Sequence, residues 1–161
     1  MLKFLNKKKK DNKGFSLVEL IIVVAIIAIL VGLLAPQYIK YVEKSRKSAD
    51  ASNLSEMVNA VQIYAADSES NLAAGTYTIT IGTNGTTVDT ALDTVISSTA
   101  PDYKTIKLKS NKWLAEGKTN ENATSISAEI VVDNNGGTKV TYKPTAVEEF
   151  VKGNGTTATT K

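Results

Sequence analysis

One ionisable side chain, Glu19, lies within a long apolar run of this sequence, and its position points to a function. Phe15–Ala35 contains 21 residues and no other charged side chain. A carboxylate at membrane depth costs roughly 2.5–3.5 kcal/mol on insertion scales, so intramembrane ionisable residues usually have a partner. Glu19 is therefore expected to pair with another group, which another part of the chain or another molecule must supply.

Catalytic chemistry has few candidate residues in this chain. It contains no histidine and no cysteine, which excludes a Ser-His-Asp triad, a thiolate metal site and any disulfide. Asp89 and Asp93 are spaced i, i+4 and could bind calcium, but solvated carboxylates on a helix face are the commoner outcome. We expect no catalytic residue, no metal and no cofactor, and therefore a protein that is not an enzyme.

A cluster of lysines precedes the apolar run. Residues 1–14 hold six lysines and one aspartate, whereas residues 15–161 hold 13 basic and 15 acidic side chains. A nucleic-acid arm is one interpretation, but lysines directly before an apolar span favour a cytoplasmic topology signal, so no specific nucleic-acid partner is expected. As a helix the run is about 31 Å long, enough to cross a bilayer core. A cleaved secretory signal is disfavoured because Pro36 directly follows Ala35.

The helical pattern continues beyond the apolar run. Pro36 can be accommodated as a kink, so one helix is expected from about Phe15 to about Asp67. An apolar stripe with the period of one helix face marks its later half, and something further along the chain must cover it. The stripe consists of Tyr38, Val42, Ser45, Ala49, Leu54, Met57, Val58, Val61, Tyr64 and Ala65, with Lys44, Lys47, Asp50 and Glu56 on the opposite face.

The remainder of the chain predicts an antiparallel sheet that covers this stripe. The sequence DNNGG indicates a hairpin turn, and Trp113 is expected in the core. The fold class is α+β, with a long N-terminal helical spine packed on a small antiparallel sheet head. The expected strands are residues 76–81, 104–109, 125–132 and 138–143. A short helix is expected at residues 88–99, and a short helix or coil at residues 146–152.

The segment KKKKDNKGFSLVELIIVVAIIAIL resembles the N-terminus of type IV pilin precursors. These have a short basic leader that ends in glycine, then an apolar segment, usually headed by phenylalanine, with glutamate as its fifth residue. Gly14, Phe15 and Glu19 occupy those positions. The helix-and-sheet outline extends the resemblance to the pilin fold. Many pilins also carry a cysteine pair that bounds a C-terminal loop, and this chain departs from them by having none.

The resemblance implies how the chain is processed and assembled. A membrane-embedded prepilin peptidase would cut between Gly14 and Phe15 and methylate the new amine of Phe15. Glu19 would pair with that amine on a neighbouring subunit and set the axial register of a homo-oligomeric filament. Gly32 and Pro36 would mark a segment that unwinds on assembly, because Pro36 leaves the carbonyl of Gly32 without an amide donor.

Three parts are therefore expected: a cleaved basic leader at 1–14, a transmembrane and assembly helix at 15–37, and a globular head at 38–161. The precursor would lie in the cytoplasmic membrane with its N-terminus in the cytoplasm, and the mature subunit in an extracellular pilus. A platform and ATPase machinery would assemble this pilus, which would serve adhesion, twitching motility or biofilm formation. Two alternatives stay open: a pseudopilin of a type II secretion or DNA-uptake machine, and a single-pass membrane-anchored sensor or enzyme.

Overall fold

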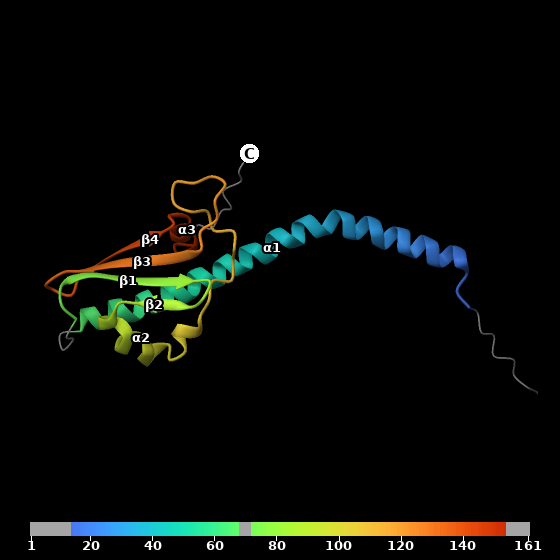
Figure 1. Ribbon diagram of the computed structural model, residues 1–161. Coiled ribbons are helices and arrows are strands. Elements are labelled where there is room, and N and C mark those ends of the chain that lie inside the picture. The colour runs from blue at the N-terminus through green and yellow to red at the C-terminus, as the bar shows by residue number, and fades with distance from the viewer. Residues whose placement is uncertain (1–13, 68–71, 154–161) are drawn as a thin grey trace, which may run out of the picture. The chain divides into compact units, whose positions relative to one another are not determined.

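The computed structural model of the chain describes residues 14–67 and 72–153 (Figure 1). The expected leader therefore lies outside the described residues, except for Gly14. The chain divides into two units after Ile39. Its helices and strands are α1 (Leu17–Ala66), β1 (Gly75–Gly82), β2 (Thr86–Val88), the 3-10 turn η1 (Thr90–Leu92), α2 (Asp93–Thr99), the 3-10 turn η2 (Tyr103–Thr105), β3 (Ser125–Val132), β4 (Thr138–Lys143) and α3 (Ala146–Val151).

In the first unit, the N-terminal part of α1 presents apolar side chains on all sides. The helix continues through Gly32 and Pro36, and every residue from Gly14 to Ile39 is exposed. Among the described helices, α1 is the one long and apolar enough to cross a membrane, a property that signal sequences near an N-terminus share. Apolar surface of this extent requires a membrane or a protein partner.

The second unit contains a four-stranded antiparallel sheet in the order β2-β1-β3-β4. β1 and β3 pair over their full length, from Gly75 opposite Val132 to Gly82 opposite Ser125. β3 and β4 form the expected hairpin, with Val132 opposite Thr138. These pairings confirm the predicted α+β class and the hairpin at DNNGG.

The turn of this hairpin packs on the C-terminal end of α1. The Asp133 carboxylate accepts hydrogen bonds from the backbone N–H groups of Asn135 and Gly137, both at 2.8 Å. Gly136 has φ +77°, and a Cβ atom there would lie 2.3 Å from the carbonyl oxygen of Ala65. The turn can therefore approach the helix this closely only with glycine at position 136.

The core of the second unit lies between the later half of α1 and one face of the sheet. Alternate residues of β1 and β3 are buried against the helix, the pattern of a sheet with one solvated face. Trp113 is fully buried, as expected, and its ring meets Phe150 of α3 edge to face with centroids 5.2 Å apart. The predicted stripe is buried at Leu54, Met57, Val58, Val61 and Ala65, whereas Tyr38 and Ser45 are exposed.

The strand predicted at residues 104–109 is wrong. η2 covers its start, and residues 106–109 form no strand although their side chains alternate between half-buried and exposed. The backbone of this segment is bound by other groups. The Leu108 N–H donates to the carbonyl of Gly82 at 3.0 Å, and the Lys109 N–H donates to the side chain of Asp50 at 2.8 Å.

The helix predicted at residues 88–99 begins later than expected. Val88 belongs to β2 and pairs with Ile79 of β1. The Asp89 carboxylate then accepts a hydrogen bond from the backbone N–H of Thr78 at 2.6 Å, which holds the chain at the sheet for one more residue. η1 follows, and α2 starts only at Asp93. Of the two states expected for residues 146–152, helix or coil, the structure shows a helix, α3.

Deleting residues 1–37 is expected to release a soluble, monomeric and folded head. The buried core of the second unit contains no residue before Asp50, so the deletion removes none of its packing. Size-exclusion chromatography and near-ultraviolet circular dichroism of the fragment would check this expectation. An aggregated fragment, or one without a tertiary signal from Trp113, would contradict the predicted boundary between assembly helix and head.

Candidate processing and assembly site

The residues around the expected cleavage position precede the first helix and are open to solvent. Gly14, Phe15 and Ser16 lie outside regular secondary structure, and Phe15 is 87% exposed. A Cβ atom at Gly14 would meet no atom within 4 Å, so nothing within the described chain requires glycine there. A requirement for Gly14 would therefore come from a peptidase cleft, in which backbone without a side chain can lie extended.

The Glu19 carboxylate caps the start of α1. It accepts a hydrogen bond from the backbone N–H of Ser16 at 2.9 Å, while the Ser16 hydroxyl accepts one from the N–H of Val18 at 3.3 Å. This reciprocal arrangement is a variant of the capping box, in which the hydroxyl binds the second helical N–H instead of the third, and two otherwise unpaired N–H groups are satisfied. Sequence reasoning missed the role of Ser16, although the spacing Ser-x-x-Glu before an apolar run is its recognisable signal.

The cap fixes where the Glu19 charge lies. The carboxylate is bonded to the residue directly after Phe15, at the positive end of the helix dipole. Gly32 and Pro36 lie further along α1, about 20 Å and 26 Å beyond Glu19 at the rise of an α-helix. The structure therefore brings Glu19 close to the expected cleavage position and leaves Gly32 and Pro36 as a separate feature.

Comparison with known proteins identifies this N-terminal segment. Residues 9–35 match the family model of the prokaryotic N-terminal methylation motif. The chain carries the class III signal peptide of type IV pilins. This motif supports a pilin-like or pseudopilin precursor that is anchored in the membrane, and a structural subunit rather than an enzyme. No curated protein and no solved structure matches the chain.

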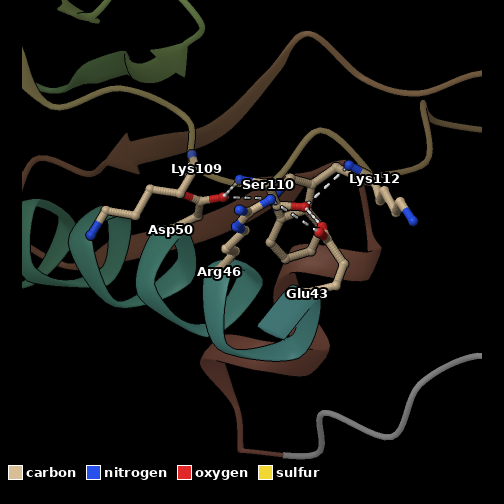
Figure 2. A network of polar contacts seen from close by, with 7 residues as sticks. Glu43, Arg46, Asp50, Lys109, Ser110 and Lys112 are labelled. Atoms are coloured by element: carbon tan, nitrogen blue, oxygen red, sulfur yellow. Dashed lines mark hydrogen bonds and ion pairs between the residues drawn. The ribbon is translucent and has the colours of Figure 1, made fainter. Parts of the chain in front are cut away.

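The pilin-like head holds a buried carboxylate near the start of its helix. Asp50 was predicted on the solvated face of α1, and this prediction is wrong because the residue is 0% exposed. Its carboxylate accepts hydrogen bonds from the backbone N–H groups of Lys109 and Ser110 at 2.8 and 2.9 Å, and from Trp113 Nε1 at 3.1 Å. Three donors satisfy the buried charge and tie residues 106–113 to the helix (Figure 2).

A second carboxylate extends this connection. The Ser110 hydroxyl donates a hydrogen bond to Glu43 and accepts one from the Lys112 N–H at 3.1 Å. Arg46 lies 3.9 Å from the other oxygen of Glu43. The Lys47 ammonium lies 5.1 Å from the centre of the Trp113 ring, and burial lowers the pKa of Lys47 despite the opposing effect of Glu43. We call the contacts of Asp50 and Glu43 with residues 106–113 the Asp50 clamp.

The two aspartates considered for calcium have separate protein partners in the pilin-like head. Asp89 is bonded to the backbone of β1, as described above. Asp93 accepts hydrogen bonds from the Tyr103 hydroxyl and, at 2.9 Å, from the Lys104 ammonium, and these bonds lower the pKa of Asp93. Burial and the neighbouring Asp93 raise the pKa of Tyr103. Within residues 14–67 and 72–153, no three potential metal ligands gather.

Proposed function

We propose that this chain is a structural subunit of a type IV pilus, processed between Gly14 and Phe15 and polymerised through the N-terminal part of α1. The observation that carries the proposal is the position of the Glu19 carboxylate. It lies one helical turn from an open Gly14–Phe15 bond, in a segment whose apolar side chains are all exposed. The cap with the Ser16 N–H is the contact of Glu19 within the described residues, and an uncharged glutamine would supply it equally well, so the cap alone does not require a charge in this apolar helix.

Cleavage would change the partner available to Glu19. In the precursor the carboxylate accepts the Ser16 N–H. Removal of residues 1–14 would leave a positive amine on Phe15, and an unpaired charge in an apolar bundle is costly. Pairing Glu19 of an incoming subunit with Phe15 of its neighbour satisfies both charges. Apolar helices can slide along one another, whereas an ion pair fixes one axial register, much as a buried polar residue does in coiled coils.

The three parts of the chain then have distinct roles. Residues 1–14 hold the N-terminus in the cytoplasm and are removed by prepilin peptidase. Residues 15–37 anchor the precursor in the membrane and later form the filament core. Residues 38–161 form the exposed head. The pilus itself would be built by an assembly platform with its ATPase and would serve adhesion, surface motility or biofilm formation.

Electron microscopy of material sheared from cells tests the filament role. An antibody raised against the head should label long, abundant filaments, and a strain lacking the gene should have none. Labelled head that stays with the cell envelope, with no filaments in the sheared fraction, would instead favour a pseudopilin of a secretion or DNA-uptake machine. Neither outcome tests cleavage between Gly14 and Phe15, which is tested by determining the first residue of the mature chain.

The segment from Gly32 to Pro36 gives a separate prediction about filament mechanics. Glycine is the least helix-favouring residue after proline, by about 1 kcal/mol relative to alanine, and Pro36 cannot donate to the Gly32 carbonyl. A Gly32→Ala, Pro36→Ala double variant is therefore expected to insert and be cleaved normally but to form fewer or stiffer filaments. Filament counts and persistence lengths from micrographs would measure this. A filament map of the natural sequence with unbroken helix from Leu20 to Tyr41 would contradict it.

A further inference from the structure

The positive charge of the head is concentrated in one region. Residues 40–50 and 106–113 together hold seven basic side chains and two carboxylates, whereas residues 51–105 and 114–153 hold five lysines and twelve carboxylates. The net charge of the whole chain, +3, conceals this separation. We call the seven basic residues the basic collar: Lys40, Lys44, Arg46 and Lys47 of α1, and Lys107, Lys109 and Lys112 of the loop after η2.

The Asp50 clamp brings the two halves of the collar together. Backbone N–H groups of Lys109 and Ser110 bind the Asp50 carboxylate, so the loop lies along the first turns of the head's helix. In Figure 2 the side chains of Lys109 and Lys112 leave the clamp on either side and extend away from the Asp50 carboxylate. Lys112 is close enough to Lys47 to disfavour its charged form.

The two carboxylates of residues 40–50, Glu43 and Asp50, do not neutralise the collar. The Asp50 carboxylate is buried and serves three protein donors. Glu43 is half-buried, and its contacts are to the Ser110 hydroxyl and, at 3.9 Å, to Arg46. The remaining collar side chains are exposed, apart from the half-buried Lys47 over Trp113. Clustered exposed cations with so few counter-charges produce a positive local field that an anionic partner would relieve.

The position of the collar in the chain indicates which anion it meets. Lys40 follows the end of the apolar run, Ala35, by five residues, which even a fully extended chain spans in about 18 Å. Exposed Tyr38 and Tyr41 flank Lys40, and tyrosines of this kind concentrate at membrane interfaces. A membrane that contains the apolar run therefore lies within about 18 Å of Lys40, the first residue of the collar.

The orientation signals of the chain do not account for the basic collar. Positive residues near a span favour the cytoplasmic side, and the lysines of residues 1–14 already supply that signal. The collar lies at the opposite end of the span, where its charge opposes the same orientation. Its presence there is explained by a function on the exported side.

We propose that the basic collar binds anionic phospholipid headgroups while the subunit is anchored in the cytoplasmic membrane, before it enters a filament. The headgroups are those of the leaflet on the exported side. This inference rests on the proposed function, because it requires the apolar run to be inserted in the membrane. Binding through both halves of the collar keeps the head in contact with the membrane surface. Without it, the head is attached to the membrane only through the transmembrane helix. Extraction into a filament then breaks these contacts, so lipid composition influences the pool of subunits available for assembly.

Amine labelling of the full chain in vesicles tests the proposal. The chain is reconstituted into vesicles of phosphatidylcholine alone or of phosphatidylcholine with phosphatidylglycerol, and a membrane-impermeant amine reagent is added. Labelling at each lysine is read by peptide mass spectrometry. Lys107, Lys109 and Lys112 decide the result because they lie in the loop. Lys139 is the internal control because it lies beside the β3–β4 turn. This turn packs on the Ala65 end of α1, whereas the collar lies at the Lys40–Lys47 end of the head's helix.

We expect the three loop lysines to react about fivefold more slowly, relative to Lys139, in phosphatidylglycerol vesicles than in phosphatidylcholine vesicles. High salt should abolish the difference, because it screens charges beyond a few ångströms. A Lys107→Gln, Lys109→Gln variant should restore labelling of Lys112. The matched pair Lys118→Gln, Lys143→Gln, which lies outside the collar and keeps Lys139 as the internal control, should not. The backbone N–H that binds Asp50 is kept in both variants.

Three other outcomes would overturn the proposal. Equal labelling in both vesicles, with the chain floating with the lipid, would reject lipid binding but leave the membrane-anchored subunit intact. Protection that depends on protein density and not on lipid charge would show that the collar meets the acidic surface of a second copy. A chain that fails to float with either vesicle would overturn the anchored stage of the proposed function and the docking with it.

Discussion

Replacing Asp50 with alanine is expected to destabilise the head by about 3 kcal/mol or more. The substitution leaves the N–H groups of Lys109 and Ser110 and the indole N–H of Trp113 without their acceptor, and each buried unsatisfied donor costs about 1–3 kcal/mol. A loss of this size should lower the melting temperature by about 10 °C. Thermal unfolding of the full chain in detergent, followed by the near-ultraviolet signal of its single tryptophan, would measure it.

Glu56→Ala is the matched control for this variant. Glu56 lies in the same helix, has the same charge and is exposed, so its loss should change stability by no more than about 0.5 kcal/mol. Equal melting temperatures for the two variants would show that the Asp50 clamp does not stabilise the head. The comparison has added weight because the chain has no cysteine, so no disulfide can hold residues 106–113 against α1.

Replacing Glu19 with glutamine is expected to abolish filament assembly while insertion and cleavage continue. Glutamine removes the charge that would pair with the Phe15 amine, and it makes the span cheaper to insert. It also serves as well as glutamate at the third position of a capping box, so the start of α1 should remain intact. Sheared filament yield, compared with the amount of processed subunit in the membrane, would measure the effect.

Ser16→Ala separates the capping role of Glu19 from its charge. This substitution removes the hydroxyl that accepts the Val18 N–H, at a cost of about 1 kcal/mol to the helix start, but it leaves the carboxylate in place. We expect Ser16→Ala to assemble at close to normal yield. If it lost filaments as completely as Glu19→Gln, or if Glu19→Gln assembled normally, the Glu19 charge would not set the axial register of the filament.

Features set by neighbouring residues could be predicted from the sequence. The continuous helix follows from an uninterrupted helical pattern, and the hairpin of β3 and β4 follows from alternating strands around an Asn- and Gly-rich turn. The class III signal is likewise contained in one short segment. The cap at the start of α1 could also be predicted, since Ser16 and Glu19 are three residues apart before an apolar run.

Features that depend on distant residues could not be predicted. A carboxylate on a helix normally indicates a solvated face, and Asp50 is buried because donors 59 to 63 residues away surround it. Similar contacts explain residues 104–109. Their side chains do alternate, but their backbone makes single hydrogen bonds to the Asp50 side chain and to Gly82 at the end of β1 instead of a ladder with a neighbouring strand. The sequence held both partners of each contact but no local signal that they meet.

The N-terminus of the chain in surface-sheared material tests the central claim most directly. Intact-mass and peptide mass spectrometry should find a mature chain that begins at Phe15 with a methylated amine, in the fraction that contains filaments. This one result would establish the cleavage position, the modification and the location together. A surface chain that still begins at Met1 would contradict the account and favour an uncleaved, membrane-anchored protein of another class.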